Sequence, residues 1–327
     1  MEKILSIVIP VYNVEQYLEK CLKSVLDIEH NDEIEVLVIN DGSTDGSMSI
    51  IEKYKNLYPL TVIVVDKENG GHGSAWNVGL KLASSKYLKF LDSDDWLENL
   101  DETIALLKRI DVDIVFSNLN IYYSEQNENK LVKIPMPVNK ILDARSFNWD
   151  TIDFKSDLTN FHYCIYRRTM LQFLYPLFLE KTSFDDGILF VAPLIYCKTI
   201  YYNDMVVYNY LIGRQGQSMG KNGNRLKKIR QIYNVRMDVL EFCHKHKTDS
   251  VPKNKKLAKI QYALVSNLFS LINRLPYEEC KEKSKKLYAE FVVLPYEFKK
   301  KYYIRMYELL PFFVYWGSIH FIKKWFK

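Results

Sequence analysis

The sequence predicts an α/β protein: one Rossmann-like domain with a mixed, mainly parallel sheet flanked by helices, followed by a C-terminal helical region. Three observations favour this fold class. Short Val- and Ile-rich segments alternate with amphipathic segments over residues 4–116, and such alternation is typical of parallel strands joined by right-handed helical crossovers. Polar, acidic or glycine-bearing residues follow the first four apolar segments. The last third of the chain is basic and has helical periodicity.

The individual elements follow from the periodicity of apolar residues. Strands are predicted, because the runs are nearly continuous and rich in β-branched residues, at residues 4–9, 35–39, 61–65, 87–91 and 113–116. Helices are predicted, from apolar residues at helical spacing, at residues 14–26, 47–58, 74–83 and 97–109. Further on, we expect a β-excursion at 121–140, a strand at 161–168, a helix from 183 to 196 and two strands at 199–205 and 206–211. Helices continue from Leu226, with breaks near Pro252, Pro276, Pro295 and Pro311.

Charge divides the chain into two parts. The formal net charge is +5, but residues 221–327 hold 24 Lys and Arg against 9 Asp and Glu. That leaves 21 basic and 31 acidic residues in residues 1–220, so the two parts carry +15 and −10. Such a division predicts two domains, residues 1–220 and residues 221–327.

The composition excludes several classes of protein. A chain of 327 residues buries enough surface to need no disulfide or metal for stability, and its 48% hydrophobic content excludes disorder and collagen. The five cysteines are scattered without metal-binding spacing, which favours a reducing compartment. The apolar run at residues 4–11 is too short for a signal peptide, and no run is long enough to span a membrane. We therefore expect a cytoplasmic location.

The sharpest chemical signal is Asp92-Ser93-Asp94 at the end of a predicted strand. In extended backbone, residues two apart point the same way, so both carboxylates can face one site. Two carboxylates with few other ligands suit Mg²⁺ or Mn²⁺, which complete their coordination with water and substrate phosphates. The alternative is an acidic turn in which Asp95 caps the next helix. Spacing alone does not decide between the two.

Two other polar loops follow predicted strands. Asp41, in NDGSTD, stands where a carboxylate could accept hydrogen bonds from a ribose hydroxyl or a base N–H, but it also fits an ordinary glycine turn. The segment NGGHGS from Asn69 could cradle phosphate at a helix N-terminus, with His72 interpreted first as a loop-packing residue. It matches neither dinucleotide nor P-loop fingerprints. Ligands of parallel sheets bind beyond the C-terminal ends of the strands, so these loops should converge on one crevice.

As a set, these motifs resemble the family-2 glycosyltransferases with the GT-A fold. The segments IVIPVYN, NDGSTDGS, ENGGHGSAWNVGL and KFLDSDDWL agree in order, spacing and strand context over residues 6–97. SFDDGILF from Ser183 is similar to the family's F-E-D-x-x-F segment. YNY from Tyr208, followed by RQGQSM, resembles its Y-x-Y-R…S-I tail. The resemblance covers about the first 220 residues and implies a GT-A-like domain of the bacterial surface-polysaccharide type.

The resemblance also implies roles for individual residues. Asp94, with Asp92, would ligate the Mg²⁺ or Mn²⁺ that bridges the donor diphosphate, and Asp92 would also hold the ribose. Asp186, or its neighbour Asp185, would be the general base that deprotonates the acceptor hydroxyl with inversion at the anomeric carbon; the alternative is that the pair stabilises a helix N-terminus. The donor would lie against Pro10, Val11, Tyr12, Asp41, Asn69, Gly71, His72, Asp92, Ser93, Arg214, Gln217 and Ser218.

The sequence departs from the family pattern in three respects. Trp76 stands where the family usually has an arginine, and Asp185 where glutamate is commoner. There is no QxxRW motif, which favours single addition over processive synthesis. The implied partners are a nucleotide-sugar donor, most simply a UDP-sugar, and a glycan or polyprenyl-linked acceptor. No nucleic-acid-binding module is present in the sequence.

The basic C-terminal part carries no catalytic motif. KKKYY at residues 299–303 precedes an aromatic run at residues 309–322, a composition that suits the interface of an anionic membrane. A helical cap with a solvated basic face is the alternative. We expect peripheral association with the inner face of the cell membrane. Two other functions remain open: a sugar nucleotidyltransferase, and an inactive GT-A-like module that docks a glycan assembly complex at the membrane.

Overall fold

The computed structural model describes residues 3–152, 160–182, 187–214 and 225–294. The chain forms two compact units, Met1–Asn254 and Lys255–Lys327. This structural division falls later than residue 220, and the functional division between residues 1–220 and 221–327 stays a prediction.

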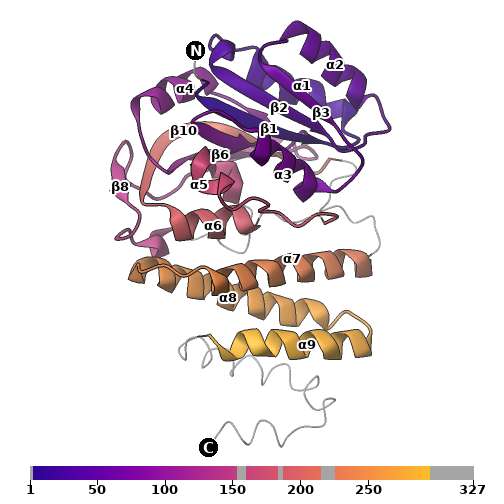
Figure 1. Cartoon of the computed structure of the whole chain (residues 1–327), viewed down its shortest axis with the longest axis vertical. Helices are drawn as coiled ribbons and strands as arrows, with labels where there is room; N and C mark the ends of the chain where they lie inside the picture. The colour runs from indigo at the N-terminus through magenta and orange to yellow at the C-terminus, as the bar shows by residue number, and fades with distance from the viewer. Residues whose placement is uncertain (1–2, 153–159, 183–186, 215–224, 295–327) are drawn as a thin grey trace, which may run out of the picture. The chain divides into compact units, whose positions relative to one another are not determined.

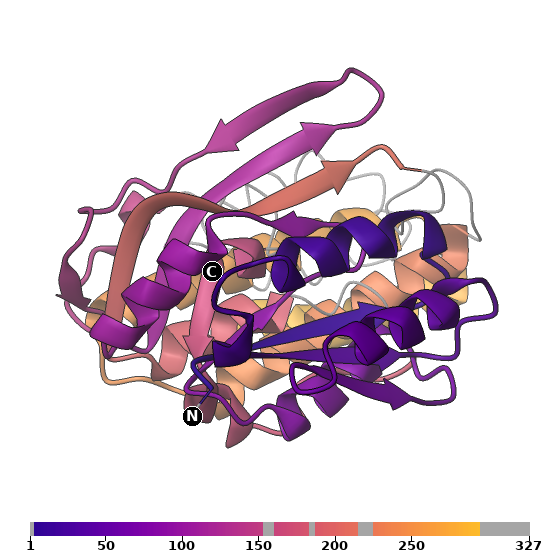
Figure 2. The same cartoon turned by 90° about the horizontal axis from the view of Figure 1, so that it is seen from above.

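The first unit is built on one mixed sheet. Its parallel part has the order β3-β2-β1-β4, formed by β1 (Leu5–Val11), β2 (Ile34–Asn40), β3 (Val62–Asp66) and β4 (Tyr87–Phe90). The sheet continues through β9 (Cys164–Arg167), β6 (Ile114–Tyr123), β10 (Thr199–Ile212) and β5 (Trp96–Leu97), with β7 (Glu128–Val132) beside β6 and β8 (Ile141–Asp143) beside β10. β9 is antiparallel to both neighbours, whereas β10 runs parallel to β6. In Figure 2 the β6–β7 hairpin (magenta) projects beyond the rest of the sheet.

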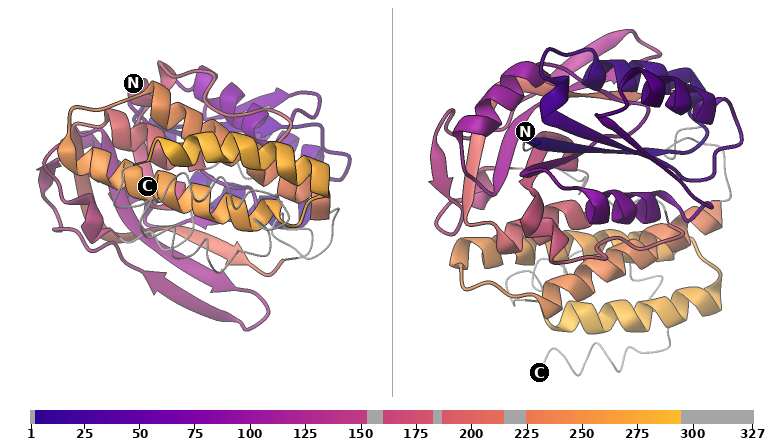
Figure 3. Two further views of the ribbon diagram at one scale, coloured as in Figure 1. Left: turned by 90° about the horizontal axis from the view of Figure 1, so that it is seen from below. Right: turned by 45° about the horizontal axis from the view of Figure 1, so that its top comes forward.

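Helices cover both faces of this sheet. Figures 1 and 3 show α1 (Glu15–Leu26) and α2 (Ser47–Leu57) on one face, and α3 (His72–Leu82) on the other with α5 (Arg168–Gln172) and α6 (Ile188–Tyr196). β1 and β2 are buried along their whole length, as expected for strands covered on both faces. Gly79 lets α3 approach β1 closely, because a Cβ there would lie 2.2 Å from Val8 Cγ1.

Most predicted elements are present, and three differ. The strands predicted at 199–205 and 206–211 are one strand, β10, whose pairing with β6 shifts register on either side of Val206. This irregular pairing interrupts the alternation of side chains near Val206 but does not end the strand. In the strand predicted at 161–168, the first residues instead belong to a 3-10 helix, Asn160–Tyr163. The helix α4 (Leu100–Arg109) begins after residue 97 because β5 pairs Trp96 and Leu97 with β10.

In the part of the chain that the structure describes, three helices follow the sheet. α7 (Arg225–Lys245) belongs to the first unit and contacts α6, whereas α8 (Val251–Ile272) leads into the second unit, which contains α9 (Tyr277–Val292). The predicted breaks near Pro252 and Pro276 are confirmed, since each proline lies at a helix start, where its missing N–H costs nothing. Pro295, Pro311 and the basic aromatic tail lie outside the described residues. Of the helices that the structure describes, none is long and apolar enough to span a bilayer.

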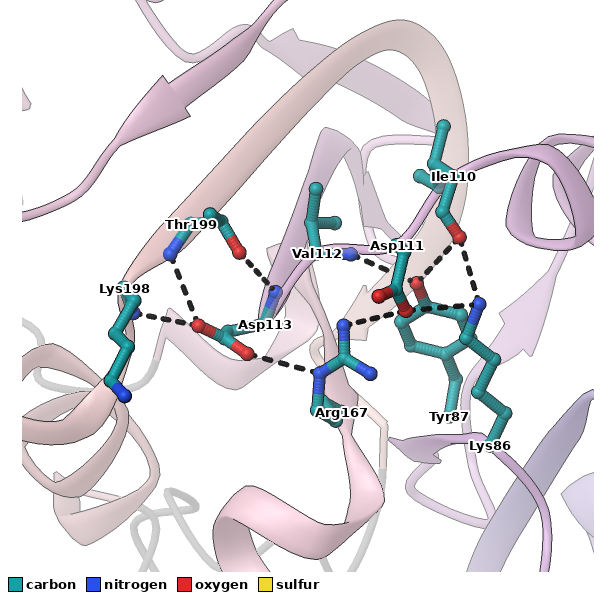
Figure 4. A network of polar contacts seen from close by, with 9 residues as sticks. All are labelled: Lys86, Tyr87, Ile110, Asp111, Val112, Asp113, Arg167, Lys198 and Thr199. Carbon is teal, nitrogen blue, oxygen red and sulfur yellow. Dashed lines mark hydrogen bonds and ion pairs between the residues drawn. The ribbon is translucent and has the colours of Figure 1, made fainter.

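A polar network links three strands at the edge of the sheet where the parallel strands begin (Figure 4). Asp113, just before β6, accepts hydrogen bonds from Arg167 Nε at 3.0 Å and from the backbone N–H groups of Lys198 and Thr199 at 2.7 and 3.0 Å. Asp111 pairs with the same arginine at 2.8 Å. This network therefore ties β6, β9 and β10 together at the edge opposite the predicted site.

Candidate active site

The four parallel strands end side by side, so the predicted loops converge on one edge of the sheet. The register pairs Val11 with Asn40, and Asn40 with Asp66, at the strand ends. Tyr12, the next residue after β1, is 51% exposed. The side chains of Pro10 and Val11 are instead buried within the sheet. Of the three residues predicted to line the nucleotide site after β1, only Tyr12 presents its side chain to solvent.

Asp41 holds the glycine-rich loop in place. Its carboxylate accepts hydrogen bonds from the backbone N–H groups of Gly70 and Gly71, at 2.9 and 2.8 Å, and from Lys67 Nζ. Asn69 Nδ2 donates to the Asp41 carbonyl at 2.9 Å. Asp41 is 3% exposed, and three donors leave about one of the four acceptor positions of its carboxylate unused. Asp41 therefore organises the loop, and any contact with a nucleotide base would use that remaining position.

The glycine-rich loop also lies beside the segment that carries the predicted catalytic base. Gly71 has φ +86°, and a Cβ there would lie 3.1 Å from Lys181 Cα and from the backbone of Thr182. The Lys181 N–H donates to the Gly70 carbonyl at 2.6 Å. Asp185 and Asp186 lie outside the described residues, but the chain that leads to them passes directly against this loop.

Asp92, at the end of β4, faces His72 at the start of α3. The distance between His72 Nε2 and Asp92 Oδ1 is 3.1 Å. Burial raises the pKa of Asp92, but the hydrogen bond from His72 and the charges of His72, His162 and Arg214 outweigh it, so the net pKa is lowered. Asp92 is therefore held as a carboxylate. His72 contacts a predicted site residue in addition to packing against Trp76, with ring centres 4.0 Å apart.

Asp94 faces Arg214, the residue that follows Gly213 beyond β10. Arg214 Nε pairs with Asp94 Oδ2, and both side chains are largely buried. Burial and the charge of Asp92 raise the pKa of Asp94, and Arg214 partly offsets this. Ser93 between the two carboxylates is buried. The structure thus brings the predicted metal ligand and the predicted diphosphate-binding arginine together; Gln217 and Ser218 lie outside the described residues.

The helix-capping alternative for Asp95 is wrong. α4 begins at Leu100 with Asn99 at its N-cap, whereas the Asp95 carboxylate accepts hydrogen bonds from Tyr208 Oη at 2.6 Å and from the Leu211 N–H at 2.8 Å. The Tyr208 hydroxyl also accepts a hydrogen bond from the Asp92 N–H at 3.2 Å. Asp95 therefore fastens the acidic loop to β10, a strand more than a hundred residues later in the chain.

Two buried side chains beneath this loop were missed by the sequence reasoning. Lys89 Nζ donates to the carbonyls of His162 and Cys164, at 2.9 and 3.2 Å, and lies 5.0 Å from the Tyr208 ring centre. Burial lowers the pKa of Lys89 to about 7. The His162 ring packs against Tyr208 with centres 4.7 Å apart. A lysine inside an otherwise apolar strand was the available signal, whereas nothing in the local pattern marked His162.

The acidic loop has donors suited to a divalent cation. Asp92 and Asp94 lie on one loop with side chains 25% and 11% exposed, and carboxylate oxygens suit Mg²⁺ and Mn²⁺. Asp92 also forms a tighter group with Asp95 and His162, in which one ligand atom from each lies within 4.8 Å of the others. Asp95 is buried and already bonded to Tyr208 and Leu211, whereas Asp92 and Asp94, although paired with His72 and Arg214, keep some exposure.

Trp76 is a core residue. Its side chain is fully buried, and its ring centre lies 4.9 Å from those of Phe90 and Phe161 and 5.1 Å from that of Phe178. The residue that replaces the family's usual arginine therefore packs beneath the site and does not stack on a ligand. Among the described residues, Arg214 does bring a guanidinium to the acidic loop.

Solved structures define the class of fold first. The crystal structure of Staphylococcus aureus TarS residues 1–349 in complex with UDP-GlcNAc aligns with a TM-score of 0.67 and 21% identity, covering 90% of this chain and 82% of that one. The mannosyltransferase PcManGT of Pyrobaculum calidifontis, in complex with GDP-Man and Mn²⁺, aligns with a TM-score of 0.51 and 16% identity, covering 94% and 85%. The predicted α/β fold with flanking helices is confirmed.

The sequence then gives the family. The model described as glycosyl transferase family 2 matches residues 6–174, and the chain belongs to that family. Curated relatives include glycosyltransferase GlyA of Streptococcus pneumoniae, 40% identical over 37% of this chain and 17% of that protein. The minor teichoic acid biosynthesis protein GgaA of Bacillus subtilis is 34% identical over 44% of this chain and 35% of that protein. The chain thus spans about a third or less of these relatives' lengths.

Proposed function

We propose that this protein is an inverting, metal-dependent glycosyltransferase that moves a sugar from a nucleoside diphosphate donor to a hydroxyl group. The observation that carries the proposal is the convergence, in a family-2 chain, of Asp41 with its glycine loop and of Asp92, Asp94 and Arg214 on one edge of the sheet. These groups suit a donor that has a neutral, planar base at one end and a diphosphate that joins the nucleoside to the sugar.

The chemistry of the proposed step is a displacement at the anomeric carbon. Asp186 or Asp185 takes the proton of the acceptor hydroxyl, whose oxygen bonds to the anomeric carbon while the carbon–oxygen bond to the diphosphate breaks. The electron pair leaves with the nucleoside diphosphate. Arg214 would stabilise that charge, since a donor oriented toward a developing charge lowers the barrier. A divalent cation held by Asp92 and Asp94 would add positive charge at the same oxygens.

The donor and acceptor classes are proposed from the relatives and solved structures that the chain resembles. The TarS structure was solved with UDP-GlcNAc, which supports a UDP-sugar, and hexosyl or N-acetylhexosaminyl transfer. Relatives named for teichoic acid biosynthesis and as a poly(ribitol-phosphate) β-N-acetylglucosaminyltransferase support a bacterial surface polymer, or its polyprenyl-linked precursor, as the acceptor. We propose that the protein meets such an acceptor at the inner face of the cell membrane, as a peripheral enzyme.

A donor screen with Mn²⁺ tests this function. We expect one donor to release nucleoside diphosphate, and Asp94→Asn to lower that release at least about a hundredfold while the fold persists by circular dichroism. Asp204→Asn removes a similar charge from an exposed carboxylate paired with Lys133 and should leave turnover unchanged. Turnover by Asp94→Asn at the wild-type level would reject the metal assignment.

The same screen separates the alternatives. A nucleotidyltransferase would release pyrophosphate and form the nucleotide sugar, whereas an inactive docking module would bind but not turn over any donor. Either result would overturn the proposed reaction.

A further inference from the structure

A row of aromatic and basic side chains leads away from the acidic loop. Arg214, which pairs with Asp94, has its guanidinium carbon 5.1 Å from the ring centre of Tyr17 on α1. Lys20 lies three residues further along α1, on the same face of the helix. Its Nζ is 2.9 Å from the ring centre of Trp96 in β5.

The series ends at the β6–β7 hairpin. Trp96 meets Tyr122 of β6 edge to face, with ring centres 5.9 Å apart, and Lys20 Nζ is 6.0 Å from the Tyr122 ring centre. We name these four side chains the aromatic–basic strip: Tyr17, Lys20, Trp96 and Tyr122. It leads from Arg214 to the hairpin, with Tyr17 and Lys20 three residues apart on α1.

The ammonium group of Lys20 is available to bind an anion. Over the part of the chain that the structure describes, its ammonium makes no ion pair and no hydrogen bond. Burial lowers the pKa of Lys20, with an opposing effect from the charge of Asp95. The contact with Trp96 stabilises the cation through the ring face but leaves N–H donors for a partner. Because Lys20 is exposed, these donors are accessible to an anion that comes from outside the fold.

The position of the strip separates it from the proposed donor site. The glycine-rich loop and Asp41 lie at the ends of β2 and β3, on one side of the acidic loop that follows β4. Trp96 and Tyr122 lie on β5 and β6, beyond β4 in the sheet order. The strip therefore extends from Asp94 toward the side that the donor-binding loops do not occupy.

We propose that the aromatic–basic strip binds the acceptor, and that this acceptor is a polyol or sugar chain bearing phosphodiester groups. Lys20 would hold one phosphate, while the rings of Trp96 and Tyr122 would contact the C–H groups of the neighbouring unit. A chain bound this way would lead toward Arg214 and Asp94. The inference rests on the proposed function and adds the chemical class of the acceptor and its binding site.

Calorimetry with a defined probe tests the strip without turnover. The probe is a synthetic hexamer of glycerol units joined by phosphodiesters, with neutral maltohexaose as its uncharged counterpart. Lys20→Gln should weaken binding of the phosphodiester hexamer about fivefold and Lys20→Arg should largely retain it. Lys23→Gln is the matched control, because Lys23 lies on the same helix and faces Glu19; it should bind like the wild type.

Steady-state kinetics then test whether Lys20 acts on the acceptor or on the donor. With the active donor, Lys20→Gln should raise the KM for the phosphodiester acceptor more than the KM for the donor. Equal calorimetric affinity of wild type and Lys20→Gln would overturn the inference, as would an effect confined to the donor KM or equal loss of maltohexaose binding. If the wild type turns over no donor, the proposed function fails, while the calorimetric comparison still decides whether the strip binds the phosphodiester chain.

Discussion

The three aspartates after β4 differ in the side chains and backbone groups that they contact. Asp92 faces His72, Asp94 faces Arg214, and Asp95 faces Tyr208 and the Leu211 N–H. Asp92 and Asp94 have partners that a ligand could share, whereas Asp95 is buried with its oxygens already bonded. Of these adjacent carboxylates, we therefore propose Asp92 and Asp94 for ligand binding, whereas Asp95 holds the loop to β10.

Tyr208→Phe tests the positioning role of Asp95. The change removes the hydroxyl that donates to Asp95 and accepts from the Asp92 N–H, so a buried carboxyl loses a partner. We expect the free energy of unfolding to fall by about 1–3 kcal/mol, measured by urea denaturation, and donor turnover to fall with it.

The matched control is Tyr58→Phe, which removes a hydroxyl that donates to the exposed Asp27 at 2.8 Å. It should cost less than about 1 kcal/mol, because an exposed hydrogen bond is replaced by water. If Tyr208→Phe were no more costly than this control, Asp95 would not fasten the loop.

At the scale of elements, the two edges of the sheet have different tasks. The edge where β1, β2, β3 and β4 end carries the loops of the candidate site. The opposite edge carries the network of Asp113 and Arg167 that joins β6, β9 and β10 (Figure 4). We therefore expect changes in the Asp113 network to alter stability without altering the chemistry at the other edge.

Asp113→Ala tests that independence. Loss of the carboxylate leaves Arg167 with Asp111 alone and removes the acceptor of the Lys198 and Thr199 N–H groups. We expect a loss of about 2 kcal/mol in the free energy of unfolding, with the KM for the donor unchanged below the transition. Asp143→Ala removes an exposed carboxylate bonded to Arg145 and should cost much less. A donor KM raised by Asp113→Ala would contradict the separation of the two edges.

Glu35 in β2 makes stability depend on pH. Burial raises the pKa of Glu35, but hydrogen bonds from Ser6, Ser84 and Ser85 outweigh it, so the net pKa is lowered. The resulting stabilisation is complete above the unfolded pKa of about 4.5 and is lost as the pH falls through the folded pKa. Urea midpoints measured from neutral to acidic pH should therefore fall less steeply for Glu35→Gln than for the wild type. Glu52→Gln, at an exposed position of α2, should follow the wild-type curve.

At the scale of the whole molecule, the charge division leads to a test of membrane binding. Residues 295–327 hold seven Lys and Arg against two Glu, together with the aromatic run. We expect the full chain to float with anionic vesicles at low salt and to remain unbound with neutral vesicles, because juxtaposed cations and aromatic residues favour an anionic interface. Removal of residues 295–327 should abolish flotation; equal flotation of both chains would discard the membrane-binding role of this segment.

The sequence by itself determined the order of the first strands and helices and the place of the polar loops. Continuous β-branched runs and helical spacing are local properties, and parallel strands deliver their C-terminal loops to one edge whatever the side chains are. That was enough to predict Asp41, His72, Asp92 and Asp94 near one another. It was also enough, with the motifs, to predict the family.

Only the tertiary structure decided how these residues are used. The partners of Asp95, Lys89 and Trp76 lie about 70 to 120 residues away in the chain in most cases, as with Asp95 and Leu211 or Lys89 and His162. The contact of Lys20 with Trp96 likewise joins an early helix to a two-residue strand that periodicity did not reveal. Local patterns record which residues are apolar and how they repeat, whereas these contacts depend on which strands become neighbours in the folded sheet.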